Sequence, residues 1–277
     1  MMNITATDRL SSVKPPRRLL AYTEYARSSW ELGALAYTWP TLLHAPLGDQ
    51  PVLVLPGLGT SGLSTAPLRH TLRALGHSTH SWGLGVNIGP SRRILIGMRA
   101  KVDELADQYG QPITLIGWSL GGIFARRLTR ENPSLIRQVI TLGSPFKLVG
   151  HEQSNASPLY RAFSHRHIED LDFPLERADG PLPVPAVALY SRLDGAVPWQ
   201  VCRDPNPTAE NIEVLCSHLG FGHSLPSLWA VADRLATGFD SSGARAPFVP
   251  PAWLRYAYPS TPAVDNAAPA LRRVESA

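Results

Sequence analysis

The sequence predicts an α/β fold, with a doubly wound, mostly parallel sheet of about six strands and a short cap insertion. Short, apolar, β-branched stretches alternate along the chain with segments whose apolar residues recur at helical spacing. Stretches such as residues 51–55 are apolar throughout, as expected of strands buried on both faces of a parallel sheet. The chain has 277 residues, 44% hydrophobic and 17% charged, which suits a domain with a large core.

The expected elements follow in order along the chain. The expected strands lie at residues 51–55, 77–82, 113–116, 138–142, 184–190 and 212–215. The expected helices lie at residues 19–43, 65–75, 91–109, 120–132 and 225–236. Gly76, Gly110 and Pro133 end three of these helices, and Pro40 is expected to break the first. The first helix is expected to pack on the outside of the core.

Composition and helix spacing divide the chain into parts. Residues 1–50 form an expected N-terminal helical extension, and residues 51–240 form the α/β domain. Within that domain, residues 143–183 carry few strong secondary-structure patterns and are expected to form a cap or lid. Residues 241–277 form a Pro/Ala-rich tail, either disordered or laid on the surface and anchored by Trp253, Tyr256 and Tyr258.

Charge and residue usage exclude several classes of function. The net charge is +4 with dispersed arginines, so nucleic-acid binding is not favoured. The histidines lack metal-ligand spacing, and no metal or organic cofactor is expected. No signal peptide or membrane-spanning stretch is visible, which predicts a cytoplasmic protein without stable membrane insertion. Cys202 and Cys216 form either one disulfide or two buried thiols, and the oligomeric state is not predicted.

The clearest motif is the segment Gly117-Trp118-Ser119-Leu120-Gly121, which lies between a predicted strand and a predicted helix. With almost no loop between them, the chain must reverse at Ser119, and small residues are needed two positions before and after it. Such a turn exposes the serine hydroxyl at the carboxyl end of a strand and aims the Leu120 N–H at a developing oxyanion. The short pattern also occurs by chance in glycine-containing loops, but the flanking strand and helix favour a nucleophile.

A serine nucleophile needs a base and usually a carboxylate that orients the base. Asp194 follows the predicted strand 184–190 and is the favoured acid, with a turn aspartate as the alternative. Asp170, Asp172 and Asp179 lie in the expected cap and follow no strand. Two histidines follow the last strand: His218 lies closer to it, and His223 begins the final helix. Spacing favours His218 as the base, with His223 as the alternative.

The glycine turn and the chain order of Ser119, Asp194 and His218 resemble the α/β-hydrolase superfamily, in particular its small bacterial lipase and esterase branch. The resemblance covers about residues 51–236. Residues 117–122 resemble the nucleophile elbow, residues 141–146 the strand and turn that follow it, residues 190–194 the acid loop and residues 211–221 the histidine loop. Relatives commonly have His-Gly after the first central strand, whereas this chain has Pro56-Gly57.

The resemblance implies a carboxylic ester hydrolase that acts through an acyl-enzyme on a small-molecule or lipid ester. It nominates the backbone N–H of Leu58 as the partner of Leu120 in the oxyanion hole. Trp118, Phe146 and Leu219 are candidate acyl-chain contacts, with ordinary core packing as the alternative. The same triad would serve an acyltransferase, thioesterase or amidase, and a hydrolase fold can also be a binding protein without catalysis.

Overall fold

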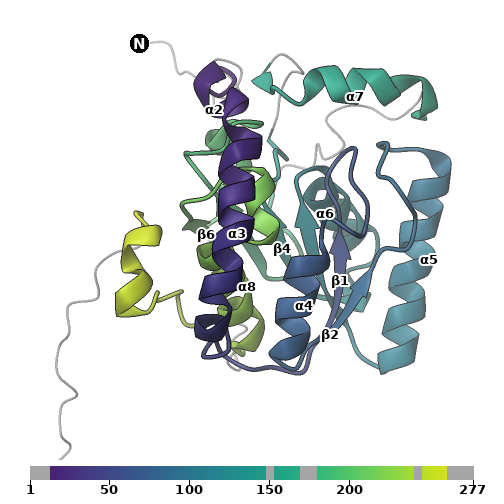
Figure 1. Cartoon of the computed structure of the whole chain (residues 1–277). Coiled ribbons are helices and arrows are strands. Elements are labelled where there is room, and N and C mark those ends of the chain that lie inside the picture. Colours follow the sequence, from purple (N-terminus) through teal and green to yellow (C-terminus); the bar gives the residue numbers. More distant parts are fainter. Residues whose placement is uncertain (1–12, 148–152, 169–179, 240–244, 261–277) are drawn as a thin grey trace, which may run out of the picture.

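The computed structural model describes residues 13–147, 153–168, 180–239 and 245–260, and it centres on one six-stranded sheet (Figure 1). The strands are β1 (Pro51–Leu55), β2 (Ser78–Ser81), β3 (Ile113–Trp118), β4 (Ile136–Leu142), β5 (Ala186–Tyr190) and β6 (Ala209–Glu213). They lie in the order β2-β1-β3-β4-β5-β6, and every neighbouring pair is parallel. The prediction of a doubly wound parallel sheet is therefore confirmed.

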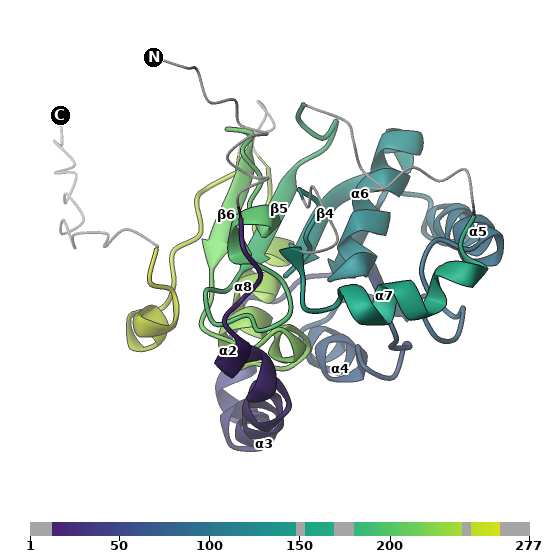
Figure 2. The ribbon, with the colours of Figure 1, turned by 90° about the horizontal axis from the view of Figure 1, so that it is seen from above.

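Helices cover both faces of the sheet. They are α2 (Arg18–Tyr22), α3 (Glu24–Leu42), α4 (Ala66–Ala74), α5 (Arg92–Tyr109), α6 (Leu120–Glu131), α7 (Ser157–Phe163) and α8 (Leu225–Ala236). Seen from above, α3, α4 and α8 lie on one side of the sheet and α5 and α6 on the other (Figure 2). Alternate residues of β1, β3, β4 and β5 contribute to two separate cores, as the period-two alternation of side chains requires.

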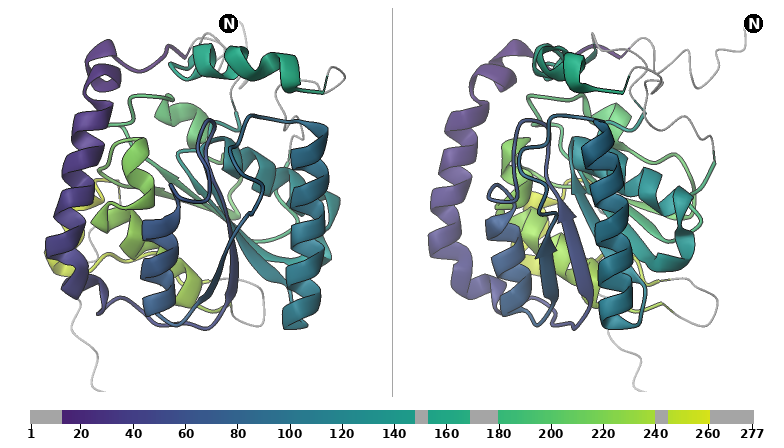
Figure 3. Two further views of the ribbon diagram at one scale, coloured as in Figure 1. Left: turned by 45° about the vertical axis from the view of Figure 1, so that its right-hand side comes forward. Right: turned by 90° about the vertical axis from the view of Figure 1, so that its right-hand side faces the viewer.

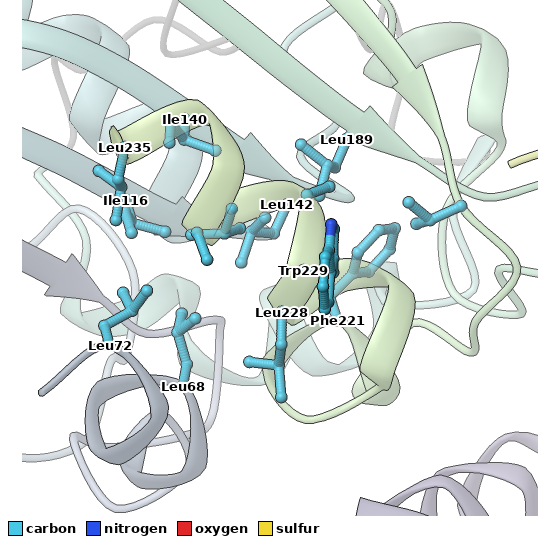
Figure 4. Packing of buried hydrophobic residues seen from close by; sticks show 14 of the residues in the cluster. Leu68, Leu72, Ile116, Ile140, Leu142, Leu189, Phe221, Leu228, Trp229 and Leu235 are labelled. Atoms are coloured by element: carbon cyan, nitrogen blue, oxygen red, sulfur yellow. The ribbon is translucent and has the colours of Figure 1, made fainter. Parts of the chain in front are cut away.

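The first core joins the sheet to α4 and α8, where Leu68, Leu72, Leu228 and Leu235 pack on Ile116 and its neighbours (Figure 4). The second core joins the opposite face to α5 and α6. Since β1, β3 and β4 are almost fully buried between the two cores, they are rigid supports for whatever follows their carboxyl ends.

The N-terminal helical segment differs from the prediction in where it breaks. The interruption falls at Thr23, between α2 and α3, whereas Pro40 lies inside α3. Pro40 lies two residues before the helix end, so α3 ends soon after the proline and is not divided by it. This segment runs down the outside of the α4–α8 layer (Figure 3), as expected.

The faces of α3 are inverted relative to an ordinary surface helix. Its exposed face carries Tyr25, Trp30 and Tyr37, each more than three-quarters exposed. Its buried residues include Glu24 and Ser28 together with two leucines. Polar groups therefore face the protein, where they must find hydrogen-bond partners.

The cap and tail are described in part. Helix α7 lies across the top of the molecule above the sheet, within the expected cap (Figure 1). In the tail, Tyr258 is buried and donates to Pro226 O, and Trp253 packs edge-on against Trp229. Tyr256 is exposed and anchors nothing. Residues 1–12 and 261–277 lie outside the described part of the chain.

Cys202 and Cys216 are both buried free thiols, so the disulfide alternative is wrong for this structure. Burial raises the pKa of each thiol well above its usual value, and a nearby carboxylate adds to the shift. Both side chains therefore act as small apolar groups of the core.

Candidate active site

The turn between β3 and α6 holds Ser119 in a strained conformation. Its φ of 53° and ψ of −121° make it the one non-glycine residue in the described chain with positive φ. The turn is fixed by a hydrogen bond from Ser119 N to Leu142 O at 2.8 Å. A bend this tight is costly for a residue with a side chain, and such strain concentrates at functional sites.

The glycines around Ser119 are required by close packing. A methyl group on Gly117 would lie 2.3 Å from the Gly122 Cα, and one on Gly121 would lie 2.3 Å from the Leu55 carbonyl oxygen. Neither clash involves a side chain that could move away. This explains the spacing of two residues on either side of Ser119, as the sequence predicts.

Asp194 and His218 are joined by a short hydrogen bond. His218 Nδ1 lies 2.6 Å from Asp194 Oδ2, and both side chains are almost completely buried. The other carboxylate oxygen, Oδ1, accepts from the main-chain N–H groups of Ala196 and Val197, each at 2.8 Å. The carboxylate is thus fixed on both oxygens, which fixes the orientation of the imidazole.

The electrostatic environment favours the imidazolium form of His218. Burial alone would lower its pKa, but the charge of Asp194 and the hydrogen bond to it outweigh burial, and Glu24 adds to their effect. The pKa of His218 is therefore raised above its usual value. A histidine with this environment can take up a proton and hold it beside a carboxylate.

The alternative base lies elsewhere. His223 Nε2 is 3.0 Å from the Ser28 carbonyl oxygen and 3.2 Å from the Ser28 hydroxyl, both on α3. Burial lowers the pKa of this ring. The structure therefore brings His218, and not His223, against Asp194.

Ser119, Asp194 and His218 follow β3, β5 and β6 and lie at the carboxyl edge of the sheet. The indole N–H of Trp118, the neighbour of Ser119, donates to the His218 carbonyl oxygen at 3.0 Å. Among the described residues, Ser119 Oγ makes no hydrogen bond to His218. Such pairs are often long without substrate and shorten in the reacting complex.

The predicted oxyanion donors lie on both sides of Ser119. Leu120 is the first residue of α6, so its N–H has no acceptor within the helix. Leu58 lies in the turn after β1, where a methyl group on neighbouring Gly57 would come within 3.3 Å of the Ser119 Cβ. The turn thus passes directly beside the serine.

Asn87, which the sequence analysis did not single out, fixes that turn. Its main-chain N–H donates to Thr60 O and its carbonyl accepts from Gly59 N. Its amide nitrogen donates to Pro56 O at 2.8 Å, and the residue is fully buried. A lone asparagine in a glycine-rich loop was the sequence feature that could have indicated this role.

A small, mainly apolar pocket opens at Ser119. It is lined by Leu58, Ser119, Leu120, Ile123, Pro145, Ser154, Ala156, Ser157, Tyr160 and Val197. Burial raises the pKa of Tyr160 to about 12, so its hydroxyl stays neutral. Helix α7 supplies one wall, which links the predicted cap to the site.

The three predicted acyl contacts lie outside this lining. Trp118 and Phe146 are buried core residues, and Leu219 packs partly buried on the α8 side of the sheet. The Phe146 ring lies 4.0 Å from the guanidinium carbon of Arg126, which is itself buried and paired with Asp204 at 2.7 Å. Trp118 and Phe146 thus contribute to the core and Leu219 packs against it, while contact of the three residues with an acyl chain stays a prediction.

Two carboxylates of α3, Glu24 and Glu31, also reach the loops of this site and were missed. Both accept hydrogen bonds from main-chain groups next to His218. Their spacing of seven residues places them on one helix face with Leu35, a buried residue. Two acidic residues on the same helix face as Leu35 were the available indication.

Within residues 13–147, 153–168, 180–239 and 245–260, the structure shows neither a candidate metal site nor a candidate membrane-spanning helix. No group of three or more His, Cys, Asp or Glu side chains there could hold a metal ion. None of the helices described is long and apolar enough to cross a bilayer. Asp170, Asp172 and Asp179 fall outside those ranges.

Comparison with protein families gives a match to the alpha/beta hydrolase fold over residues 50–175. The match contains the Ser119 turn and ends before Asp194 and His218. A search of curated proteins gave no match.

Solved structures also resemble this chain. The Bacillus licheniformis lipase BlEst2 in propeptide form matches with a TM-score of 0.51 and 16% identity, over 73% of this chain and 54% of that one. Aspergillus fumigatus lipase B matches with a TM-score of 0.48 and 14% identity, over 68% and 52%. A monoacylglycerol lipase from Paleococcus ferrophilus matches with a TM-score of 0.47 and 14% identity, over 69% and 96%. This chain thus spans about half the length of the first two.

Proposed function

Because this chain has the α/β-hydrolase fold, we propose that it is a serine-dependent carboxylic ester hydrolase with Ser119 as nucleophile, His218 as base and Asp194 as the acid. The observation that carries the proposal is the 2.6 Å hydrogen bond between His218 and Asp194, in the same carboxyl edge as the strained Ser119 turn. The fold match alone supports no activity, so the proposal depends on these side chains.

In the proposed reaction, His218 Nε2 takes the proton of Ser119 Oγ as the oxygen attacks the ester carbonyl carbon. The carbonyl oxygen becomes negative and is held by the Leu58 and Leu120 N–H groups. His218 then gives its proton to the departing alcohol, which leaves an acyl group on Ser119. Water, deprotonated by His218, attacks that acyl group; the bond to Ser119 Oγ then breaks, the acid leaves, and His218 returns the proton to Ser119 Oγ.

The pocket supports an uncharged, apolar acyl group. All the described side chains that line it are aliphatic, aromatic or hydroxyl-bearing, and none of these is charged. Because a charged acyl group would lose its hydration there without a partner, it would be disfavoured. We therefore propose a small-molecule or lipid ester substrate.

Hydrolysis of p-nitrophenyl esters by the full chain tests this proposal. The Ser119→Ala variant should lose at least about a thousandfold in kcat/KM. A fluorophosphonate probe should label one peptide, the one that contains Ser119. The matched control is Ser134→Ala, which removes an exposed hydroxyl just before the N-terminal end of β4, at the edge of the sheet opposite to Ser119.

Two outcomes would contradict the proposal. Unlabelled wild-type protein without esterase activity would indicate a binding protein. Wild-type turnover in Ser119→Ala would remove Ser119 as nucleophile. A thioester and an amide with the same acyl group then test the leaving group, and an acyl-length series ending in emulsified triglyceride separates lipase from esterase.

A further inference from the structure

Glu24, near the start of α3, connects the acid loop and the base loop. Its Oε2 accepts from the main-chain N–H of Gly195 at 3.0 Å, and its Oε1 accepts from the N–H of Leu219 at 2.8 Å. Gly195 directly follows Asp194, and Leu219 directly follows His218. One carboxylate therefore fixes the backbone next to both members of the hydrogen-bonded pair.

Two further residues of α3 hold the opposite sides of the same loops. Arg27 donates to the Leu193 carbonyl oxygen at 2.8 Å, on the residue before Asp194. Glu31 accepts from the main-chain N–H of Ser217 at 2.7 Å, on the residue before His218. Every one of these four contacts is thus made to a residue adjacent to Asp194 or His218.

Arg27 and Glu24 also form an ion pair at 2.8 Å, so the side chains that contact the two loops also contact each other. We call Glu24, Arg27 and Glu31 the α3 clamp. Helix α3 lies before residue 50, where the family match begins.

Two glycines in the loops make room for the clamp. A methyl group on Gly195 would lie 2.4 Å from the Leu20 carbonyl oxygen and 2.6 Å from Glu24 Oε2. One on Gly220 would lie 1.7 Å from Glu31 Oε2. Neither glycine has positive φ, so close approach of the helix, and not the turn itself, requires them.

The burial of Glu24 argues against a role in stability alone. The residue is 6% exposed, and an ionised carboxylate taken out of water is costly unless all its partners are well placed. An apolar side chain at this position would pack without that cost, but it could not accept from two loops at once. The carboxylate therefore gives a defined loop geometry that packing alone would not give.

We infer that Glu24, with Arg27 and Glu31, is a positioning residue that holds Asp194 and His218 in register with Ser119. The inference rests on the proposed function for its catalytic meaning, but the positioning itself can be measured in protein without activity.

The charge of Glu24 also acts on His218. The charged groups that face the imidazole are Asp194 from the acid loop and Glu24 from α3, with Glu31 beside Ser217 and Arg27 paired to Glu24. The aromatic neighbours Trp118 and Phe221 carry no charge. Because a base must be neutral to act, activity should rise with pH through the pKa of His218.

The test substitutes Glu24→Gln, which keeps shape but loses the charge and one acceptor oxygen. An amide group then faces one of the two main-chain N–H donors, so one loop is released. We expect kcat to fall about 10- to 100-fold with KM within twofold, since the residue does not line the pocket. The acidic limb of the kcat/KM profile should move to lower pH, because a negative charge that stabilises the imidazolium is removed.

A second readout is independent of turnover. In NMR spectra of the wild type, the low-field proton of the His218–Asp194 hydrogen bond is identified by its absence in His218→Gln. Its signal should broaden or shift in Glu24→Gln, and the His218 ring should titrate at lower pH. If the wild type lacks esterase activity, the proposed function fails while these spectra still decide the positioning role.

The matched control is Glu210→Gln. The Glu210 carboxylate also accepts from a main-chain N–H, that of Phe248, and pairs with Arg234 and Arg245. It lies on β6 away from the loops of the site. This variant should lose thermal stability while its kcat, pH profile and His218 spectrum match the wild type.

Folded Glu24→Gln protein with wild-type kcat, acidic limb and low-field signal would overturn the inference. Equal losses of kcat in Glu24→Gln and Glu210→Gln would also overturn it, because they would indicate general destabilisation. If Glu24→Gln does not fold, Glu24→Asp decides. Its shorter arm keeps the charge but cannot span both loops, so a wild-type kcat and low-field signal there would contradict positioning.

Discussion

The nucleophile turn and the acid and base loops are stabilised in opposite ways. The glycines beside Ser119 are required by nearby backbone, since the contacts that exclude a side chain at Gly117 and Gly121 involve this turn, strand β1 and Pro56. The loops that carry Asp194 and His218 are held by α3, across 166 to 195 residues of sequence. The first region is constrained by sterics and the second by buried charge.

This difference determines what each region tolerates. A methyl group at Gly117 or Gly121 would lie less than 3 Å from backbone atoms, so the turn requires glycine at both positions. A charged hydrogen bond can lengthen and weaken gradually, because the loop can shift or the helix can tilt. Substitutions in the turn should therefore affect folding, whereas substitutions in the clamp should affect the geometry of the acid and base.

The largest expected effect tests which loop histidine belongs to the site. We expect His218→Ala to lose at least about a thousandfold in kcat/KM, because the proton acceptor is removed. His223→Ala should stay within about tenfold of wild type, since that ring bonds Ser28 on α3 and not Asp194. Ester hydrolysis by both purified variants measures this. An active His218→Ala would transfer the base to His223.

The next effect concerns the turn. Gly121→Ala should lower the free energy of unfolding by about 3 kcal/mol or more, because the methyl group meets the Leu55 carbonyl at 2.3 Å. Urea unfolding measures the change. The matched control is Gly33→Ala on the exposed face of α3, where nothing lies within 4 Å. It should stabilise the protein by about 0.5–1 kcal/mol, since alanine favours the helix. Equal stability of the two variants would contradict the steric account.

The sequence predicted the Ser119 turn, Asp194 and His218, and it missed the contacts that α3 makes to the acid and base loops. The Ser119 turn could be found because its strand, helix and glycines are adjacent in the chain, and β1 and α8 were placed at their observed bounds. Asp194 and His218 were chosen because each follows a strand, a rule of parallel sheets that needs no knowledge of contacts.

Other features depend on which segments meet in space. The Trp118 and Phe146 side chains were expected near substrate, but whether a residue beside a turn faces the pocket or the core depends on side-chain direction. Glu24 and Glu31 lie 171 to 195 residues from their main-chain partners, and no pattern in the helix indicates which residues those are. From the sequence, Gly195 fits a turn residue that follows Asp194, and no local pattern indicates that its nearest contact is the Leu20 carbonyl oxygen.

The smallest effect separates these two interpretations of Gly195. If the residue served only the turn, alanine would be harmless, because its φ is not positive. If Gly195 instead allows the close approach of α2 and α3, the added methyl group pushes these helices outward, since its nearest contact is the main-chain oxygen of Leu20. We expect a loss of about 1–2 kcal/mol in the free energy of unfolding, because an outer helix can tilt where the Ser119 turn cannot. The kcat should fall about 3- to 10-fold with KM unchanged, because the acid loop moves and the acyl pocket does not. Stopped-flow and urea measurements on Gly195→Ala and Gly121→Ala together compare the two regions directly. For Gly195→Ala, the α3 clamp predicts a loss of kcat larger than the fraction of unfolded protein explains. For Gly121→Ala, the steric account of the turn predicts a loss of stability with wild-type kcat in the folded fraction.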